Sequence, residues 1–288
     1  MCAGHALRAF VRFAGTVVGF CPSCQTGAVV EVPTRAFNGE SADDYSTRYE
    51  SELLTTKALT CWDIVRRETR GRLEGRRLLD VGCGHGAFLD LARRDGLRTA
   101  GVEIAAHAAD AAEAKGHQVF RRSAEEPFCQ PDERFDIITM WDILEHLARP
   151  RLALQHAYDR LAEGGRLFVL TPMMSSPYDR WGLLIHRLTG GRCDQLLRMC
   201  WDQNHLSRFA REGTRRVLLS VGFAKVTADP VLLLSLRADS YAGGSILPHW
   251  TGVGSLDRLL SRGGVRLAKL FGLHNKLLIV AGREGADG

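Results

Sequence analysis

"LLDVGCGHGAFLD", residues 78–90, opens as an apolar run and breaks into three alternate glycines, Gly82, Gly84 and Gly86. The run before Asp80 predicts a buried strand, and the new hydrophobic period after Gly86 predicts an amphipathic helix. A glycine turn between a strand and a helix N-terminus presents backbone N–H groups to a ligand, because no side chain holds the ligand away. The stretch predicts a nucleotide-like cofactor, although such turns serve several cofactors.

Strands and helices alternate along the chain after this turn. We expect strands at 97–104, 117–122, 135–142 and 166–172, with helices at 105–116 and 150–165. This alternation predicts an α/β fold with a doubly wound parallel sheet, whose ligands bind at the carboxyl ends of the strands. A helix at 211–223 and two last strands at 224–229 and 275–284 follow, and the sequence leaves the direction of those two strands open.

The composition is that of a soluble globular protein, with 45% hydrophobic and 25% charged residues in 288. The net charge of +5 comes from basic residues scattered among acids, which argues against nucleic-acid binding. No apolar run is long enough to span a bilayer, so we expect no transmembrane segment. Eight cysteines in a chain of this size indicate a reducing cytoplasm, with thiols or metal ligands rather than disulfides.

Five motifs follow one another in the order of a known family. They are "LLDVGCGHG", "GVEI", "RRSAEEPF", "FDIITMWDILEHLARP" and "LAEGGRLFVLTP". Together they make the region from about residue 76 to 284 resemble the class I S-adenosylmethionine-dependent methyltransferases, in the branch of the ubiquinone-pathway O-methyltransferases. The resemblance implies S-adenosylmethionine as cofactor. It also implies a Rossmann-like, seven-stranded sheet whose last inserted strand is antiparallel.

Two carboxylates have the chemistry that this cofactor needs. Glu103, at the end of the second strand, can accept hydrogen bonds from both hydroxyls of an adenosine diol. Asp80, just before the glycines, can face the cationic methionine end of the cofactor. The alternate reading of both is that of surface carboxylates at strand ends.

The resemblance assigns further cofactor contacts. Ala124 and Glu125 would flank the adenine, and Asp142 belongs to the motif that follows the fourth strand. In related enzymes a tyrosine-bearing segment folds over the methionine end of the cofactor. "DDYSTRYES", residues 43–51, resembles that segment and makes Tyr45, or Tyr49 on the same helical face, a candidate, with packing against the sheet edge as the equal alternative.

Methyl transfer to a hydroxyl needs a group that takes its proton, and histidine suits this near neutral pH. His146 shares one helical face with Asp142 and Glu145, and His205 lies where the family often places a His-Leu pair. Both histidines are candidates, with a structural role as the alternative for His146. Some relatives use magnesium at the Asp142 motif, although an imidazole does not especially suit that ion.

Other functions remain open on the residues alone. "GCGHGA" also fits the dinucleotide pattern G-x-G-x-x-[G/A], which would make the protein an NAD-dependent oxidoreductase. A protein that binds S-adenosylmethionine without catalysis would keep Asp80 and Glu103 but need no base. Transfer to nitrogen or carbon has the same geometry as transfer to oxygen. We expect a methyltransferase that acts on a small molecule, most plausibly on a hydroxyl, in a secondary-metabolite or cofactor pathway.

The N-terminal part lies outside the methyltransferase motifs. Cys2, His5, Cys21 and Cys24 form two close pairs of metal-ligand types, which resemble a zinc ribbon with one thiolate replaced by His5. Bound structural zinc and a vestigial, metal-free ribbon are equal alternatives. We expect an appendage at 1–35, a helical cap at 36–75 and the catalytic domain at 76–288, with lid insertions at 173–206 and 231–275. The residues do not indicate an oligomeric state.

Overall fold

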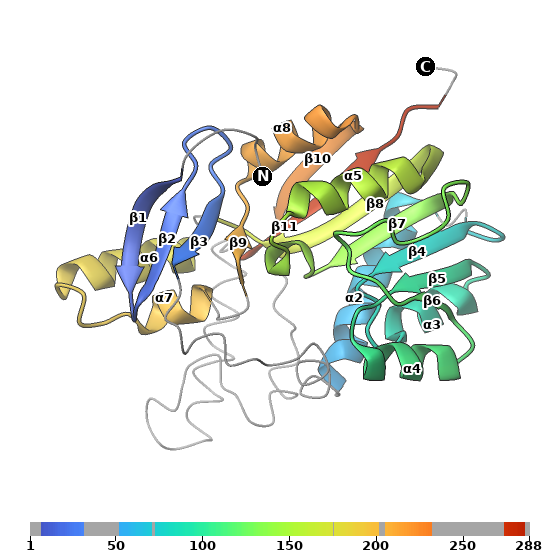
Figure 1. Cartoon of the computed structure of the whole chain (residues 1–288), viewed down its shortest axis with the longest axis horizontal. Helices are drawn as coiled ribbons and strands as arrows, with labels where there is room; N and C mark the ends of the chain where they lie inside the picture. The colour runs from blue at the N-terminus through green and yellow to red at the C-terminus, as the bar shows by residue number, and fades with distance from the viewer. Residues whose placement is uncertain are drawn as a thin grey trace.

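The computed structural model describes residues 7–31, 52–70, 73–174, 176–201, 205–231 and 274–285. A large α/β unit and a smaller lobe of strands and helices lie side by side (Figure 1). The candidate cofactor residues lie on the large unit, and the smaller lobe combines the N-terminal strands with the segment that follows the central sheet's longest strand.

The central sheet has seven strands in the order β10-β11-β8-β7-β4-β5-β6. Their bounds are β4 Arg77–Val81, β5 Arg98–Val102, β6 Gln118–Phe120, β7 Phe135–Trp141, β8 Leu161–Pro172, β10 Ala224–Val231 and β11 Lys276–Gly282. The five neighbouring strands β8, β7, β4, β5 and β6 pair in parallel. Strand β11 is antiparallel to both of its neighbours, β8 and β10. The expected seven-stranded sheet with an inserted antiparallel strand is therefore confirmed.

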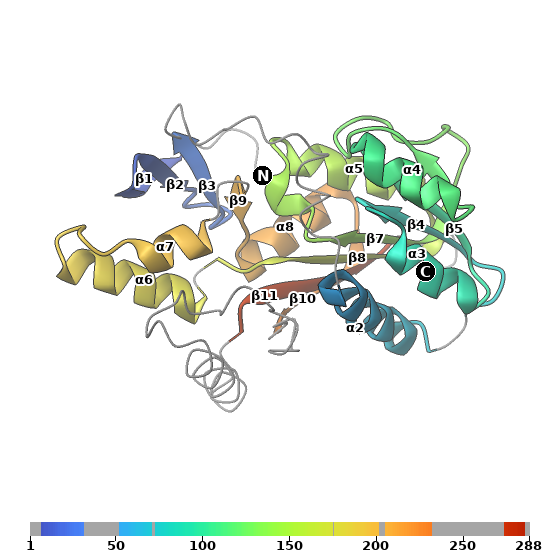
Figure 2. The same ribbon diagram turned by 90° about the horizontal axis from the view of Figure 1, so that it is seen from below.

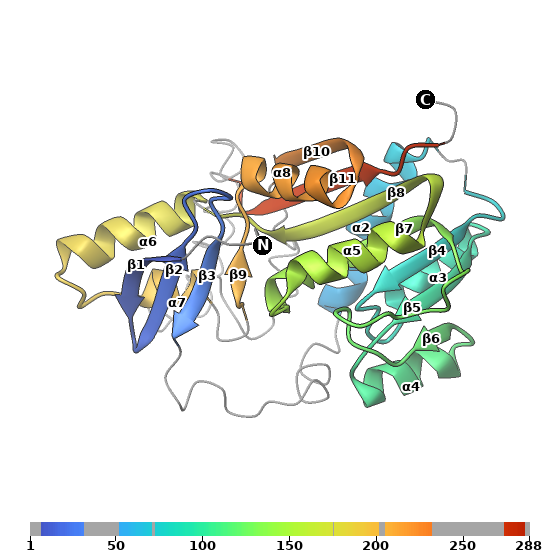
Figure 3. The same cartoon turned by 45° about the horizontal axis from the view of Figure 1, so that its top comes forward.

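Helices cover both faces of this sheet, which explains why successive residues of the central strand β4, from Leu78 to Val81, are all buried. Leu78 packs with α2 (Glu52–Glu68) and α3 (Ala87–Arg94) on one face, and its neighbour Leu79 packs with α5 (Pro150–Arg160) and α8 (Arg211–Val221) on the other. Figure 3 shows α5 and α8 lying on the same face. Helix α4 (Ala106–Ala114) precedes β6 at the sheet edge.

The helix expected at 150–165 is shorter in the structure. It ends at Arg160, and the next residues already belong to β8, which pairs with β7 from Leu161 onward. The glycine pair that signalled a helix end therefore lies inside a strand, where Gly164 has a positive φ of 70° next to a shift in register. Tertiary pairing overrides the local glycine signal here.

A second sheet forms the smaller lobe. Strands β1 (Arg8–Phe13), β2 (Thr16–Phe20) and β3 (Gly27–Glu31) form an antiparallel meander, to which β9 (Ser207–Arg208) adds a short edge. Its apolar face packs on α7 (Gln195–Cys200) and on residues that follow β8 and α7. The buried members of this cluster are Phe13 and Val18 of the sheet, with Met174, Leu197, Cys200 and Trp201. The insertion after β8 also contains α6 (Pro177–Leu188). This insertion packs on the N-terminal strands, a contact that nothing in the sequence predicted.

Several expectations fall on residues outside the described ranges. They are the contact from Tyr45, the ligands Cys2 and His5, and most of the insertion at 231–275. Within the described ranges, no helix combines the length and apolar character needed to cross a membrane.

Candidate functional site

The glycine turn is held against the end of β5. The amide groups of Gly82 and Cys83 both donate to the carbonyl of Val102, at 2.7 and 3.1 Å, and the Gly84 amide donates to the Glu103 carboxylate at 2.8 Å. Gly82 has a φ of +77°, and a Cβ there would lie 2.1 Å from the Ile143 side chain. A non-glycine residue at this position would be both strained and crowded, so the tight turn requires glycine.

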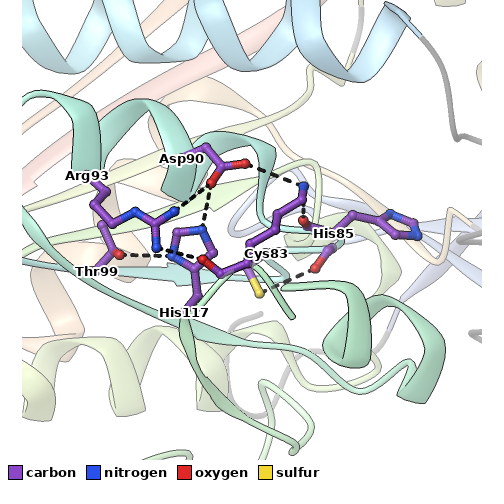
Figure 4. A network of polar contacts seen from close by, with 8 residues as sticks. Cys83, His85, Asp90, Arg93, Thr99 and His117 are labelled. Atoms are coloured by element: carbon purple, nitrogen blue, oxygen red, sulfur yellow. Dashed lines mark hydrogen bonds and ion pairs between the residues drawn. The ribbon is translucent and has the colours of Figure 1, made fainter. Parts of the chain in front are cut away.

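A polar network fixes the segment that follows the turn (Figure 4). Asp90 accepts a hydrogen bond from the buried ring of His117 at 3.0 Å, and the other His117 nitrogen meets the Thr99 hydroxyl at 3.1 Å. Lys115 binds Asp90 at 3.4 Å and donates to the His85 carbonyl at 2.7 Å. These contacts connect the start of α3 to β5 and to the residues before β6, and thereby set the position of the loop.

Two carboxylates flank the loop as expected from the sequence. Asp80 is buried and accepts a hydrogen bond of 2.6 Å from Thr139 on the neighbouring strand β7. Burial raises the pKa of Asp80 to about 7, because Thr139 is too weak a partner to offset the lost hydration. Glu103 is half-buried, and its two oxygens accept from the amides of Gly84 and Ala105, each at 2.8 Å. Each carboxylate oxygen keeps a lone pair for a further donor.

Asp142 is engaged by two lysines. Lys57 of α2 and Lys276 of β11 each bind one of its oxygens at 2.7 Å, and the three side chains are 18–25% exposed. Burial would raise the pKa of Asp142, but the two ammonium groups outweigh it and hold that pKa well below its usual value. Asp142 also has a φ of +55°, where backbone conformation is strained for a non-glycine residue. Neither lysine was anticipated from the sequence, because they come from distant segments that only the fold brings together.

The two candidate histidines meet. The rings of His146 (in the 3-10 turn η1, Leu144–His146) and His205 (just before β9) lie 5.0 Å apart between their centroids. Glu145 is fully buried behind them, where one oxygen accepts from Thr171 at 3.0 Å. The other oxygen of Glu145 and Nδ1 of His205 are buried without a hydrogen-bond partner among the described residues. Orphaned buried polar atoms of this kind point to a missing ligand or proton partner.

The pKa values of this cluster differ from ordinary ones. Burial, with the nearby charge of Asp142, raises the pKa of Glu145 well above its usual value. Burial, with His146 and Lys276, lowers the pKa of His205 to about 3, so its imidazole is neutral at neutral pH. A neutral imidazole can accept a hydrogen bond from a substrate hydroxyl.

The same three residues are also a possible set of metal ligands. Ligand atoms of Glu145, His146 and His205 all lie within 4.8 Å of one another, the only such group among the described residues. Two imidazoles and one carboxylate suit a transition metal better than magnesium. Asp142, which the sequence suggested as a magnesium ligand, is held by Lys57 and Lys276.

The two residues expected to flank the adenine, Ala124 and Glu125, lie after β6. Ala124 is buried, and the Glu125 carboxylate accepts from the Arg149 amide and lies 3.6 Å from the Arg149 guanidinium. Glu125 thus ties the loop after β6 to the start of α5. Its role toward adenine stays a prediction.

The zinc prediction concerns the smaller lobe. Cys21 and Cys24 form a tight turn, in which the Cys24 amide donates to the Cys21 sulfur at 3.5 Å, and both are buried. The Cys24 thiol also lies 3.3 Å from the Thr26 hydroxyl. The turn has the form of one half of a ribbon site, and its partners Cys2 and His5 lie outside the described residues. Zinc therefore stays a prediction, which metal analysis of reduced, chelator-free protein would check.

This geometry is shared with a known class of proteins. The strand order, the inserted antiparallel strand and the acid-flanked glycine turn define the class I S-adenosylmethionine-dependent methyltransferases. A family model described as "Methyltransferase domain" matches residues 60–228, more than half of the 288 residues. The chain belongs to this methyltransferase domain family.

Individual relatives agree with the family. The chain is 34% identical over 113 residues to a ubiquinone biosynthesis O-methyltransferase of Alkalilimnicola ehrlichii, a match that covers 37% of this chain and 45% of the relative. The chain thus spans less than half of the curated relatives' length. A solved S-adenosylmethionine-dependent methyltransferase of Archaeoglobus fulgidus has a TM-score of 0.51 at 20% identity and covers 78% of this chain and 94% of that one.

The fold also occurs with other chemistry. The cyclase SpnF superposes with a TM-score of 0.51 at 19% identity, covering 78% of this chain and 80% of that one. The fold alone therefore does not settle the reaction, and the residues of the site must carry that argument.

Proposed function

We propose that this protein transfers the methyl group of S-adenosylmethionine to a hydroxyl of a small-molecule acceptor. The observation that carries the choice of cofactor is the pair of carboxylates on either side of the glycine turn. Glu103 would hold the ribose diol and Asp80 would face the cationic methionine end, while Gly82, Gly84 and Gly86 let the backbone approach. The bound cofactor supplies an activated methyl sulfonium.

The chain's own residues then align the acceptor, exclude water and take a proton. The acceptor oxygen attacks the methyl carbon, the carbon–sulfur bond breaks, and its electron pair stays on sulfur. The hydroxyl proton goes to the cluster of Glu145, His146 and His205. Nδ1 of His205 is buried and lacks a partner among the described residues, so it can accept the hydroxyl hydrogen bond. Buried Glu145 lies within reach of both imidazoles, and because its pKa is raised while that of His205 is lowered, Glu145 would hold the proton.

The choice of oxygen rests on two observations. The curated relative named above is an O-methyltransferase by its name, and the cluster offers proton acceptors next to a neutral imidazole. A neutral amine would not need this cluster to attack, because its lone pair is already available, whereas a carbon acid would need it to lose a proton. Transfer to nitrogen or carbon is the runner-up, and a non-catalytic S-adenosylmethionine-binding protein is the third candidate. The earlier expectations of a cytoplasmic protein and of a secondary-metabolite or cofactor pathway belong to this proposal.

The test is a transfer assay with cofactor labelled in its methyl carbon. Purified protein is incubated with a panel of phenols and catechols, of amines, and of activated carbon acids. We expect label in an O-methyl ether together with S-adenosylhomocysteine, and loss of transfer in His205→Gln with cofactor binding retained. Label in an N-methyl or C-methyl product would replace the hydroxyl assignment. Cofactor binding without turnover on any acceptor would favour the non-catalytic alternative.

A further inference from the structure

Two lysines share one carboxylate directly after β7. Lys57 of α2 and Lys276, the first residue of β11, each bind one oxygen of Asp142 at 2.7 Å. Figure 2 shows α2 lying against the sheet that contains β11, which explains how residues from such distant segments meet. The side chains of the two lysines are 25% and 18% exposed, so both ammonium groups have lost much of their hydration.

The charges of this group do not balance. Asp142 supplies one negative charge for two ammonium groups, and no second carboxylate pairs with Lys57 or Lys276 among the residues that the structure describes. A charge removed from water is costly unless it is paired. An ammonium group also has three N–H donors, of which a single ion pair uses one. The group therefore has the character of a binding site for an anion.

The two lysines lie between the two parts of the candidate site. Burial raises the pKa of Asp80, which would face the cationic end of the cofactor, and the charge of Lys57 is near enough to oppose that rise. Burial also raises the pKa of Glu145 and lowers the pKa of His205, and the charge of Lys276 acts on both groups. In the proposed function the acceptor oxygen lies between the methyl group and these proton acceptors, so both ammonium groups are close to the reacting atoms.

Magnesium, which the sequence suggested for this motif, does not fit Asp142. Each oxygen of this carboxylate already binds an ammonium group at 2.7 Å. A magnesium ion on the same oxygens, at about 2.1 Å, would lie against two positive charges of the chain. The lysines thus supply the positive charge that a divalent cation would bring.

We propose that Lys57 and Lys276 are catalytic residues that hold the acceptor as an oxyanion, in the role that a divalent cation would have. The inference rests on the proposed function and adds two residues to its site. The acceptor hydroxyl gives its proton to Glu145, and the two ammonium groups stabilise the oxyanion through charge-assisted hydrogen bonds. The oxyanion then attacks the methyl carbon, and the electron pair of the carbon–sulfur bond stays on sulfur.

The ionisation of a bound phenol tests this without turnover. 4-Nitrocatechol, whose phenolate absorbs visible light, is titrated into protein saturated with S-adenosylhomocysteine, and its absorbance is followed against pH. A nearby opposite charge lowers a pKa by about 1–3, so we expect the bound probe to ionise at least about 1 pH unit below its pKa in solution. In Lys57→Met and in Lys276→Met most of this shift should be lost. Transfer of labelled methyl to the probe should then fall about tenfold or more, because a pKa difference of about 1 corresponds to about tenfold.

Further variants separate charge from packing. Lys276→Arg keeps the positive charge and should keep the shift, whereas Asp142→Asn removes the competing carboxylate and should enlarge it. Asparagine tolerates the positive φ of this position. Lys225→Gln is the matched control, because Lys225 is exposed on the edge strand β10. Calorimetry with S-adenosylhomocysteine shows for each variant whether the fold and the cofactor site are retained.

Several results would overturn the inference while binding of S-adenosylhomocysteine stands. They are no binding of the probe, a bound probe that keeps its solution pKa, a shift that survives in both methionine variants, and a transfer rate that requires added magnesium. If neither methionine variant folds, the wild-type spectrum and Asp142→Asn decide the question. Absence of S-adenosylhomocysteine binding in the wild type would instead contradict the proposed function.

Discussion

The buried carboxyl of Asp80 makes cofactor binding depend on pH. In the free protein its pKa is about 7, because burial disfavours the charged form. The cofactor brings a permanent sulfonium charge to this end of the pocket, which favours the ionised carboxylate and lowers that pKa in the complex. Binding then releases a proton from the fraction of protein in which Asp80 is protonated, so affinity falls as the pH falls below 7.

The size of the effect follows from linkage. With a free-state pKa of about 7 and a much lower one in the complex, affinity should fall about 25-fold between about pH 7.5 and about pH 5.5, or about 2 kcal/mol. Titration calorimetry in buffers of different ionisation enthalpy would measure both the affinity and the proton released.

Two variants separate Asp80 from its neighbours. Asp80→Asn keeps an acceptor for the Thr139 hydroxyl but cannot ionise, so its affinity should be lower and nearly independent of pH. Glu145→Gln should keep the wild-type slope, because Glu145 lies in the other cluster. A wild-type affinity that stays flat across this range, or an unchanged slope in Asp80→Asn, would refute the reasoning.

Three further outcomes follow from the same geometry. Glu103→Gln should weaken S-adenosylmethionine binding by about 2 kcal/mol in a folded protein, and unchanged affinity in calorimetry would remove Glu103 from the cofactor site. His205→Gln should lower kcat by roughly 10²–10⁴-fold with little change in cofactor affinity, whereas a change confined to the acceptor KM would make His205 a binding residue. Gly82→Ala should lower the melting temperature and abolish cofactor binding, because the added Cβ meets Ile143. Gly84→Ala should lower the melting temperature less, because the space around Gly84 is open. Equal losses in the two variants would count against the packing argument.

The parts of the fold that depend on local pattern could be predicted from the sequence. The strands and helices of the central sheet follow from apolar runs, a period change and glycine or proline signals. The exception at Gly164 and Gly165 is instructive, because pairing of β8 with β7 takes up residues that locally resemble a helix end. The packing of the β1–β3 meander on the segment around α7 was not predictable either, because no local signal encodes contacts between segments so far apart.

The candidate site likewise has a part that could be predicted from the sequence and a part that could not. Asp80, Glu103 and the glycines lie within one strand-turn-helix unit and its neighbour, so their spacing in the sequence reports their spacing in space. The partners of Asp142 could not be predicted in this way, because Lys57 lies on α2, before the glycine turn, and Lys276 on the last strand, β11. The meeting of His146 with His205 likewise depends on the path of the chain after β8.

The identity of the bound cofactor is the most direct test of the account. Calorimetric titration of the purified chain with S-adenosylmethionine, S-adenosylhomocysteine and NAD, each alone, would determine it in one set of measurements. We expect one site per chain for both sulfur compounds, lost together in the double variant Asp80→Asn/Glu103→Gln, and no binding of NAD. Binding of NAD in place of the sulfur compounds, or no binding of either sulfur compound by folded protein, would contradict it.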